Sequence, residues 1–322
     1  MDTPLNIDLE SADIVGFQGL TDRDLDEVAE HILQLDPEGR RFAKVFRDTF
    51  DQLYDGQRTG RYRWDQLFKT EKTHYGTLIE INLQREFEFA DGDVLDYKIV
   101  GREVDCKYSF RDGGWMLPPE SWNQLILVAT ASDEGSTWSV GLVRVSPANR
   151  RTTFNRDGKT NLNQAGRSAI KWLFRNVEFA PNVLLQLSAI AIEAIYSQRA
   201  GQARLDEFFR QAEGRRVHRN TIATVAQQQD YMKRVRYNGG SRTNLQAEGF
   251  LILGGDYIVH RNIAQDFGGP VPRPGEFVCI RVVEVTSVDP RAVLLDGKHW
   301  RRAAQNEAVQ GVAPRLPSTR SD

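Results

Sequence analysis

The chain has only two cysteines, Cys106 and Cys279, among its 322 residues. Two cysteines cannot build the framework of several disulfides that stabilises small secreted domains. Neither the Cys-x-x-Cys spacing nor the paired-histidine spacing of zinc sites occurs in the sequence. We therefore expect two unpaired thiols and no zinc site. The histidines are scattered, which favours packing or surface roles over catalysis: His31, His74, His218, His260 and His299.

Long apolar runs are also missing. The richest stretch, residues 184–195, is interrupted by Gln186, Ser188 and Glu193, and a bilayer-spanning helix needs about 18 or more apolar residues. The N-terminus, MDTPLNIDLES, lacks the basic and then apolar pattern of a signal peptide. Hydrophobic and charged residues make up 40% and 27% of the chain, which are ordinary globular values. We therefore expect a globular protein of the cytoplasm.

Charge is distributed unevenly along the chain, although the net charge is only -2. Residues 1–36 contain ten acids and one base, whereas residues 199–242 contain ten bases and four acids. An Arg-rich block of this kind can neutralise phosphates, which favours a nucleic-acid partner. The alternative is a solvated basic surface.

The chain length favours two domains, since one domain commonly takes roughly 150 residues. We predict a first domain over residues 1–176, a linker over 177–182 and a second domain over 183–322. The first combines helices at 22–35, 42–53 and 77–87 with strands at 94–100, 103–110, 125–130 and 138–145, followed by a loop at 146–166. The helix at 77–87 is expected to be largely buried. The domain junction is expected within residues 174–181.

The second domain shows helical patterns at 189–196, 205–213 and 228–236, while residues 221–226 fit a strand or the start of a helix. A turn at 238–240, a helix capped by Ser241 and a strand at 250–253 follow. This order is typical of a winged helix-turn-helix. The tail from residue 312 contains Pro314 and Pro317, and we expect it to be disordered.

An acid followed two residues later by lysine occurs at Asp96/Lys98, Asp105/Lys107, Asp157/Lys159 and Asp296/Lys298. The last two pairs enclose a glycine and are most simply turns. Asp105 and Lys107 instead lie within an expected strand, where alternation places both on one face. The pattern alone therefore does not identify a site, but the strand context singles out this pair.

Two further acids can join Asp105 and Lys107. Asp96 lies in the neighbouring strand of a predicted hairpin, and Glu80 lies on a helix rich in leucine and isoleucine. Clustered carboxylates repel one another unless a cation lies between them, and Mg²⁺ prefers oxygen ligands. Metal-assisted phosphodiester hydrolysis could use such a cluster. The alternative is that Asp105 and Lys107 form a simple ion pair while Glu80 is exposed.

The first half of the chain contains five distinctive strings: Asp51-Gln-Leu-Tyr-Asp-Gly-Gln-Arg-Thr-Gly-Arg-Tyr-Arg-Trp-Asp-Gln-Leu67, Lys69-Thr-Glu-Lys-Thr-His74, Glu80-Ile-Asn-Leu83, Val104-Asp-Cys-Lys107 and Trp115-Met-Leu-Pro-Pro-Glu-Ser121. Together they resemble the NaeI family of type IIE restriction endonucleases. The resemblance resumes at residues 201–204, 223–228 and 232–236, so it covers both predicted domains. It fades before residue 38, between 145 and 198, and over the last 20 residues.

The resemblance implies a mixed α/β fold, with a PD-(D/E)xK nuclease core followed by a winged-helix domain similar to that of CAP. It implies that Glu80, Asp96, Asp105 and Lys107 are catalytic and that Mg²⁺ binds to the three acids. It also implies a homodimer that binds two copies of double-stranded DNA, one cleaved at a GC-rich palindrome and one acting as effector. The resemblance further implies a functional partner, without physical contact, in a cognate DNA methyltransferase of the same bacterial restriction system.

Residues that contact DNA are expected in both domains. The first set is Arg58, Arg61 and Arg63, and the second is Lys233, Arg234, Arg236 and Arg242. Leu53-Tyr54-Asp55-Gly56 resembles the Lys-x-Asp-Gly motif of DNA ligases, but leucine replaces the nucleophilic lysine. The rival function is a DNA-binding regulatory or topoisomerase-like protein whose nuclease domain is inactive or reseals its cuts. The four acidic and basic side chains disfavour inactivity, and Leu53 disfavours ligation.

Overall fold

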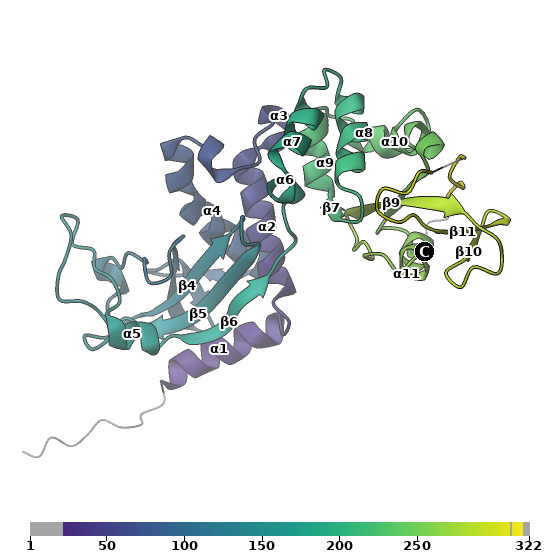
Figure 1. The fold of residues 1–322 in the computed structure, drawn as a ribbon. Helices are drawn as coiled ribbons and strands as arrows, with labels where there is room; N and C mark the ends of the chain where they lie inside the picture. Colours follow the sequence, from purple (N-terminus) through teal and green to yellow (C-terminus); the bar gives the residue numbers. More distant parts are fainter. Residues whose placement is uncertain (1–21, 310, 318–322) are drawn as a thin grey trace, which may run out of the picture.

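The computed structural model describes residues 22–309 and 311–317, which form two groups of helices and strands (Figure 1). Each group contains one β-sheet, six-stranded in the N-terminal group and five-stranded in the C-terminal group. This architecture confirms the mixed α/β class. Within the described residues, no helix is long and apolar enough to cross a membrane. Cys106 and Cys279 are both buried and unpaired, as expected.

The N-terminal sheet has the order β1-β2-β3-β4-β5-β6. Only β3 and β4 pair in parallel, and the other neighbours are antiparallel. The strands are β1 Ala90–Asp91, β2 Tyr97–Ile99, β3 Arg102–Tyr108, β4 Leu125–Ser132, β5 Thr137–Arg144 and β6 Lys171–Glu178. The helices of this part are α1 Arg23–Leu35, α2 Arg40–Tyr54, α3 Gly56–Thr59, η1 Trp64–Gln66, α4 Lys69–Phe87, η2 Pro119–Ser121 and α5 Gln164–Ser168.

The two faces of this sheet are covered differently. On one face, apolar residues of α1, α2 and α4 pack with Val104, Cys106 and Leu127 of the strands. The other face buries Ile126 and Val128 beneath Trp115, Leu117 and Leu162, which come from connecting segments. The second face of the sheet is therefore covered by loops rather than by helices.

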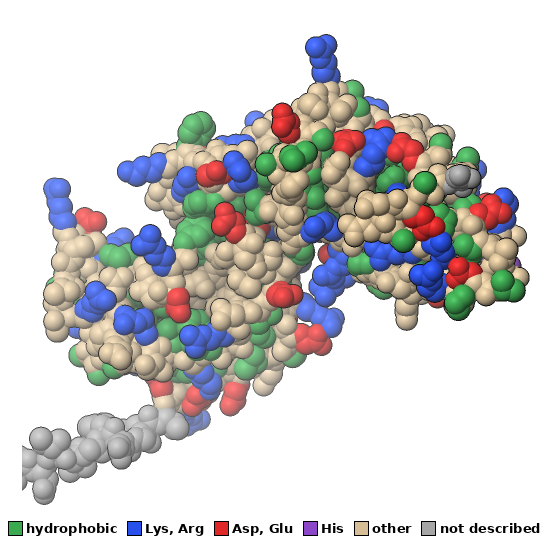
Figure 2. Space-filling view, in the orientation of Figure 1, with side chains coloured by type: hydrophobic (Ala, Val, Ile, Leu, Met, Phe, Trp, Pro, Cys, Tyr) green, Lys and Arg blue, Asp and Glu red, His purple; other side chains and the backbone are tan. Residues whose placement is uncertain are grey.

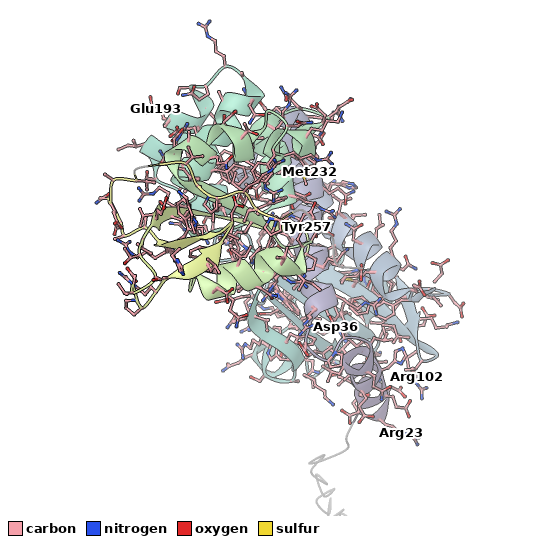
Figure 3. All side chains as sticks on the ribbon, turned by 90° about the vertical axis from the view of Figure 1, so that its right-hand side faces the viewer. Arg23, Asp36, Arg102, Glu193, Met232 and Tyr257 are labelled. Carbon is pink, nitrogen blue, oxygen red and sulfur yellow. The ribbon has the colours of Figure 1, made fainter. Side chains whose placement is uncertain are left out.

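The C-terminal sheet is organised around β9, which pairs with β7, β8 and β11. Its strands are β7 Arg216–His218, β8 Phe250–Gly254, β9 Glu276–Glu284, β10 Val293–Leu295 and β11 Lys298–Arg302. The helices of this part are α6 Val183–Gln186, α7 Ala189–Tyr196, α8 Gly201–Gln211, α9 Arg219–Ala226, η3 Tyr231–Val235, α10 Ser241–Asn244, η4 Gln246–Glu248 and α11 Ile258–Asp266. In the side view of Figure 3, Met232 and Tyr257 lie in this part, whereas Arg23 and Arg102 lie in the N-terminal part.

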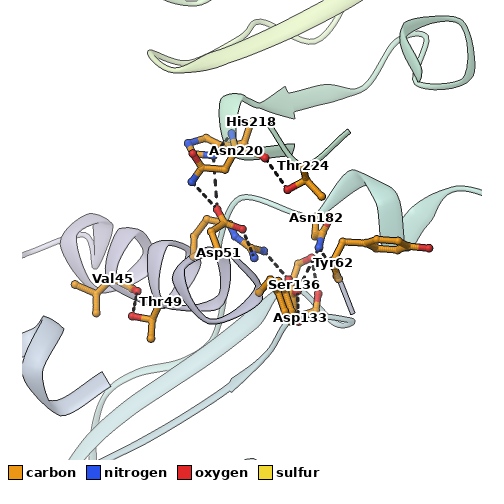
Figure 4. Close-up of polar contacts among 12 residues, drawn as sticks. Val45, Thr49, Asp51, Tyr62, Asp133, Ser136, Asn182, His218, Asn220 and Thr224 are labelled. Carbon is orange, nitrogen blue, oxygen red and sulfur yellow. Dashed lines mark hydrogen bonds and ion pairs between the residues drawn. The ribbon is translucent and has the colours of Figure 1, made fainter. Parts of the chain in front are cut away.

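A buried polar cluster joins the two parts (Figure 4). Arg47 of α2 is 3% exposed and binds Asp51 at 2.8 Å and Asp133 at 2.5 Å. Asp133, at the turn after β4, also accepts a hydrogen bond from Asn182 at 3.4 Å. Asn220 of α9 donates to the second carboxylate oxygen of Asp51 at 2.7 Å. The charge of Arg47 is therefore balanced by acids that also bind the C-terminal part.

Several sequence expectations are corrected by the structure. Residues 171–178 form β6, so the first part of the junction predicted at 174–181 is a strand, and this strand also includes the start of the predicted linker. Residues 77–87 are only the second half of α4, which buries one face, Tyr75, Ile79, Leu83 and Phe87, rather than most of its surface. Helix α2 runs to Tyr54, one residue beyond the predicted end at residue 53, and stops there because Asp55 adopts a left-handed conformation.

Three further expectations in the C-terminal part are also corrected. The helix expected at 228–236 is only the short 3-10 helix η3, whereas residues 221–226, which fit either a strand or the start of a helix, belong to helix α9. Helix α10 has Gly240 at its N-cap position, and Ser241, the expected cap, is its first residue. The tail expected to be disordered from residue 312 packs against the protein as far as residue 317, with Ala313 and Leu316 buried, and its residues 318–322 lie outside the described part. The predicted domain boundaries themselves stay predictions.

Candidate active site

Strand β3 places Asp105 and Lys107 on one face of the N-terminal sheet. Val104 and Cys106 point into the helix-covered core, so the residues between and beside them point the other way. The parallel register sets Asp105 beside Ile126 and Lys107 beside Val128. The two charged side chains therefore lie on the face covered by connecting segments, as the alternating pattern predicts.

Asp96 lies immediately before β2 and is held against β3. One of its carboxylate oxygens, Oδ2, accepts a hydrogen bond from the backbone nitrogen of Cys106 at 2.7 Å. The Lys107 ammonium lies 3.6 Å from the same oxygen and 2.5 Å from Oδ1 of Asp105. It also donates to the carbonyl of Cys106 at 3.0 Å. The structure thus brings Asp96, Asp105 and Lys107 together.

Glu80 reaches this group from helix α4. The Tyr97 hydroxyl donates to the backbone carbonyl of Glu80 at 2.7 Å, which ties this turn of the helix to β2. Burial raises the pKa of Glu80 to about 7, and the nearby charge of Asp96 adds to this shift while Lys107 opposes it. A raised pKa of this kind means that the carboxylate lacks sufficient positive charge around it.

Asp105 shows the same shortage of positive charge. Its side chain is 3% exposed, and burial raises its pKa to about 7, with Asp96 adding to the shift and Lys107 opposing it. Its second oxygen, Oδ2, is buried and has no hydrogen-bond partner. Buried carboxylate oxygens normally have a donor or a cation beside them. The unpartnered oxygen and the raised pKa values therefore fit a further cation at this cluster.

The ammonium group of Lys107 supplies positive charge to the cluster of Glu80, Asp96 and Asp105. Burial disfavours its ammonium form, but the charge and hydrogen bond of Asp105 outweigh this effect and raise its pKa. No set of three or more His, Cys, Asp or Glu side chains in the described part of the chain is arranged to hold a metal ion. The Lys107 ammonium lies between the acids instead. Chemically, this set could bind a divalent cation and hold an ammonium group beside a phosphate.

The arginines expected to contact DNA near residue 60 are engaged in ion pairs to different degrees. Arg61 forms two hydrogen bonds of 2.8 Å to Glu71 and is only 19% exposed. Arg58 is 83% exposed and lies 3.1 Å from Asp55. Arg63 pairs with Asp65 at 3.2 Å. Arg58 and Arg63 can therefore reach an external phosphate more easily than Arg61.

The basic residues expected to contact DNA in the C-terminal part are also unequal. Lys233 and Arg236 are exposed at η3 and just after it. Arg234 lies 3.5 Å from Asp230. Arg242 is turned into the protein, where its Nε donates to the carbonyl of Ile252 at 2.9 Å and burial lowers its pKa. Lys233 and Arg236 of this set therefore present exposed charges without an acidic partner in the described residues, whereas Arg234 is 39% exposed and paired.

The remaining motifs have structural roles. Leu53, which stands in place of the ligase lysine, is a core residue with 7% exposure. Asp296 and Lys298 flank a glycine turn between β10 and β11. Sequence reasoning missed the part played by Tyr97, which is buried and anchors Glu80. The signal was its position next to Asp96 in an alternating strand.

Comparison with known proteins gives two findings. A family model described as restriction endonuclease NaeI matches residues 26–311. The chain is 46% identical over 308 residues to the type II restriction enzyme NaeI of Lentzea aerocolonigenes. The matched region covers 92% of this chain and 95% of that protein.

Proposed function

This chain belongs to the restriction endonuclease NaeI family and is a type II site-specific restriction endonuclease. We propose that its catalytic residues for DNA cleavage are Glu80, Asp96, Asp105 and Lys107. The observation that carries this assignment is the contact of Lys107 with both Asp105 and Asp96 on one sheet face. The unpartnered buried oxygen of Asp105 supports it. DNA is the substrate.

We further propose that Mg²⁺ is the cofactor and that Asp96, Asp105 and Glu80 hold it. When bound, the ion supplies positive charge that stabilises the phosphodiester transition state and acidifies water. The residues of the chain do the rest. Asp96 is kept in place by the Cys106 amide, and Glu80 by the bond from Tyr97 to its own backbone. Lys107 orients water or stabilises the charge that develops on the phosphate oxygens.

Substitution of Asp105 tests this assignment. Asp105→Asn keeps the shape of the side chain but removes its charge, so we expect plasmid cleavage with Mg²⁺ to be lost. Binding of a duplex in metal-free buffer should persist, because the sheet face stays folded. Asp296→Asn is the matched control, since Asp296 belongs to another Asp-x-Lys sequence that lies in a turn. Cleavage by Asp105→Asn at the rate of the control would contradict the assignment.

We also propose the finer properties that the family resemblance implies. These are a homodimer, a GC-rich palindromic target, a second bound DNA copy that activates cleavage, and a cognate methyltransferase in the bacterial cytoplasm. The order α8, β7, α9, η3, α10, β8 and β9 supports a winged-helix domain, because β9 lies between β7 and β8 in the sheet. The exposed side chains of Lys233 and Arg236 support its contact with DNA.

A further inference from the structure

We propose that residues 150–162, here called the basic arm, bind the sugar–phosphate backbone of the substrate DNA beside the catalytic cluster. This inference rests on the proposed function, because it takes Asp105 and Lys107 as the place where DNA is cut. It assigns a role to a segment that the sequence predicts only as a loop.

The basic arm is an ordered hairpin-like structure. Its base is closed by a backbone bridge between Arg150 and Leu162, and a second bridge joins Thr160 to Leu117. The Thr160 hydroxyl lies within hydrogen-bond distance of two carbonyls across the arm, 3.1 Å from that of Arg151 and 2.9 Å from that of Thr153. A segment already fixed in this way loses little conformational entropy when it binds.

The tip of the basic arm is closed by Asn155. Its side-chain oxygen accepts from the backbone nitrogens of Asp157 at 3.0 Å and Lys159 at 2.8 Å, and its backbone nitrogen donates to the carbonyl of Lys159 at 2.9 Å. Gly158 takes the left-handed conformation that this turn requires. The turn thus holds the flanking side chains outward in a defined arrangement.

The outward side chains carry positive charge. Arg151, Arg156 and Lys159 are all exposed, and none of them forms an ion pair with another residue in the described ranges. Asp157 is the only acid in the arm. Exposed arginines such as Arg23, Arg40 and Arg58 have acidic partners, whereas the arm places three basic side chains without such partners in the described part of the chain within nine residues of one another. The arm therefore presents cations that the protein itself does not neutralise.

The arm lies on the catalytic face of the sheet. Asp105 and Lys107 share that face with Ile126 and Val128, their register partners. These two apolar side chains are buried in one cluster with Leu162, the last residue of the arm, and Leu117, which is bridged to Thr160 of the arm. The helices α1, α2 and α4 pack on the opposite face. Asp105 and Lys107 therefore share a sheet face with the base of the arm, while Glu80 reaches the same cluster from α4.

The loop leading into α5 projects beyond the sheet in Figure 1, and Lys and Arg side chains are prominent on that side of the molecule in Figure 2. The base of the arm is held by Trp122, because the Arg150 guanidinium lies 4.4 Å from its ring and the Phe154 ring lies 5.4 Å away. The occupant that matches unneutralised cations beside a nuclease site is a DNA backbone.

Salt dependence of binding provides the test. Each phosphate contact releases counterions, so three lost contacts should lower the slope of log Kd against log salt by about 2 to 3 and weaken binding about tenfold or more. The test variant carries Arg151→Gln, Arg156→Gln and Lys159→Gln in the full-length chain. Its affinity for a fluorescent duplex, containing the cleavage site mapped on a plasmid, is measured in metal-free buffer at several salt concentrations.

The matched control carries Arg23→Gln, Arg40→Gln and Arg85→Gln. These residues are exposed on α1, α2 and α4, the helices of the opposite face, and their loss changes the net charge equally. We expect the control to keep the slope of the native protein. Thermal unfolding of both variants should match that of the native chain, since all six side chains are exposed.

Two outcomes would overturn the proposal. One is an arm variant whose salt slope equals that of the control. The other is an arm variant whose molecular mass in sedimentation equilibrium changes, because the arm would then serve contact between protein copies. Failure of the proposed function is seen separately, as plasmid cleavage by Asp105→Asn, and does not alter how the binding slopes are interpreted.

Discussion

At the scale of single residues, Lys107 is the side chain whose role is most sharply divided between two explanations. It either acts on the reacting phosphate or only neutralises Asp105, to which it binds at 2.5 Å. Its contact with Asp96 at 3.6 Å places it between two acids rather than beside one. A residue that only neutralised Asp105 would not need this central position.

We expect Lys107→Ala to lower the single-turnover cleavage rate by about 10² to 10⁴, as is typical when a positioned acid, base or electrostatic group is removed. Lys298→Ala is the control, because Lys298 pairs with Glu284 on an exposed strand. Quenched-flow or manual single-turnover assays at saturating enzyme give the rates. Loss of less than about threefold would leave Lys107 as an ion-pair partner only.

His260 gives a prediction about pH. It is 1% exposed and accepts a hydrogen bond from the backbone nitrogen of Gly254, while its other ring nitrogen lies 2.9 Å from the carbonyl of Pro317. Burial lowers its pKa to about 4, and the charge of Arg242 adds to this effect while the contact with Pro317 opposes it. The folded protein therefore keeps this ring neutral where the unfolded chain would bind a proton.

Between about pH 4 and 6.5, the unfolded state binds one more proton at this site than the folded state does. Stability should therefore fall as the pH falls through this window and be unaffected by His260 above it. Thermal unfolding of His260→Gln, which retains donor and acceptor groups without titrating, should show a shallower loss over the same window. Equal slopes for the two proteins would assign the acid sensitivity to other groups.

At the scale of helices and strands, the alternation of polar and apolar residues predicts the orientation of a strand where its two faces differ in polarity. Residues 103–108 alternate cleanly, which correctly predicted the face that Asp105 and Lys107 share. Strand β6 gave no such pattern, because Lys171, Arg175, Asn176 and Glu178 make it polar and it pairs with β5 through an irregular register. An edge strand of this kind is specified by its neighbour rather than by its own sequence.

Contacts between segments that are distant in the sequence also could not be predicted from the local sequence pattern. The packed tail depends on Gln246, which exchanges hydrogen bonds with Ala313, and on the Tyr237 hydroxyl, which accepts from the nitrogen of Leu316. The same is true of Arg61, whose partner Glu71 comes from helix α4. The sequence therefore indicated which side chains could carry chemistry, but not which of the arginines were already paired.

The contact between α3 and α9 gives a prediction at this scale. A Cβ atom on Gly56 would lie 2.1 Å from Oγ1 of Thr224 and 2.9 Å from the carbonyl of Arg61. We therefore expect Gly56→Ala to destabilise the protein by about 1 to 3 kcal/mol through overpacking. Denaturant unfolding measures this loss.

Thr224→Ala should restore part of the stability when combined with Gly56→Ala, because it removes the nearest atoms but leaves the Arg61 carbonyl. Gly76→Ala is the control. It lies within α4, where the nearest atom to an added Cβ is 3.9 Å away, so it should be neutral or stabilise by up to about 1 kcal/mol. A Gly56→Ala protein as stable as Gly76→Ala would show that α3 and α9 separate easily.

At the scale of the whole molecule, the open issue is whether the C-terminal part binds a second DNA that activates cleavage. An effector that binds the active state preferentially shifts the population toward it. Lys233 and Arg236 are exposed in the part that the family resemblance assigns to this effector.

We expect plasmids with two target sites to be cut faster than plasmids with one, and added short cognate duplex to accelerate cutting of the latter. Lys233→Gln combined with Arg236→Gln should reduce this acceleration, while Arg199→Gln, an exposed arginine before α8, serves as control. Initial rates on supercoiled plasmids measure both effects. Duplex that only competes at every concentration would leave the C-terminal part with a role in recognition or assembly.

The buried cluster of Arg47, Asp51, Asp133, Asn182 and Asn220 has a consequence for protein engineering. A hybrid protein could be designed by joining the N-terminal part of this chain to the C-terminal part of a relative. The contact between the two parts contains a guanidinium and two carboxylates, and the carboxylates also accept hydrogen bonds from Asn182 and Asn220. A half taken from a relative without these two asparagines would leave hydrogen-bonding groups unpaired in the interior. Exchangeable halves must therefore be chosen for the match of this contact before they are chosen for the DNA they bind.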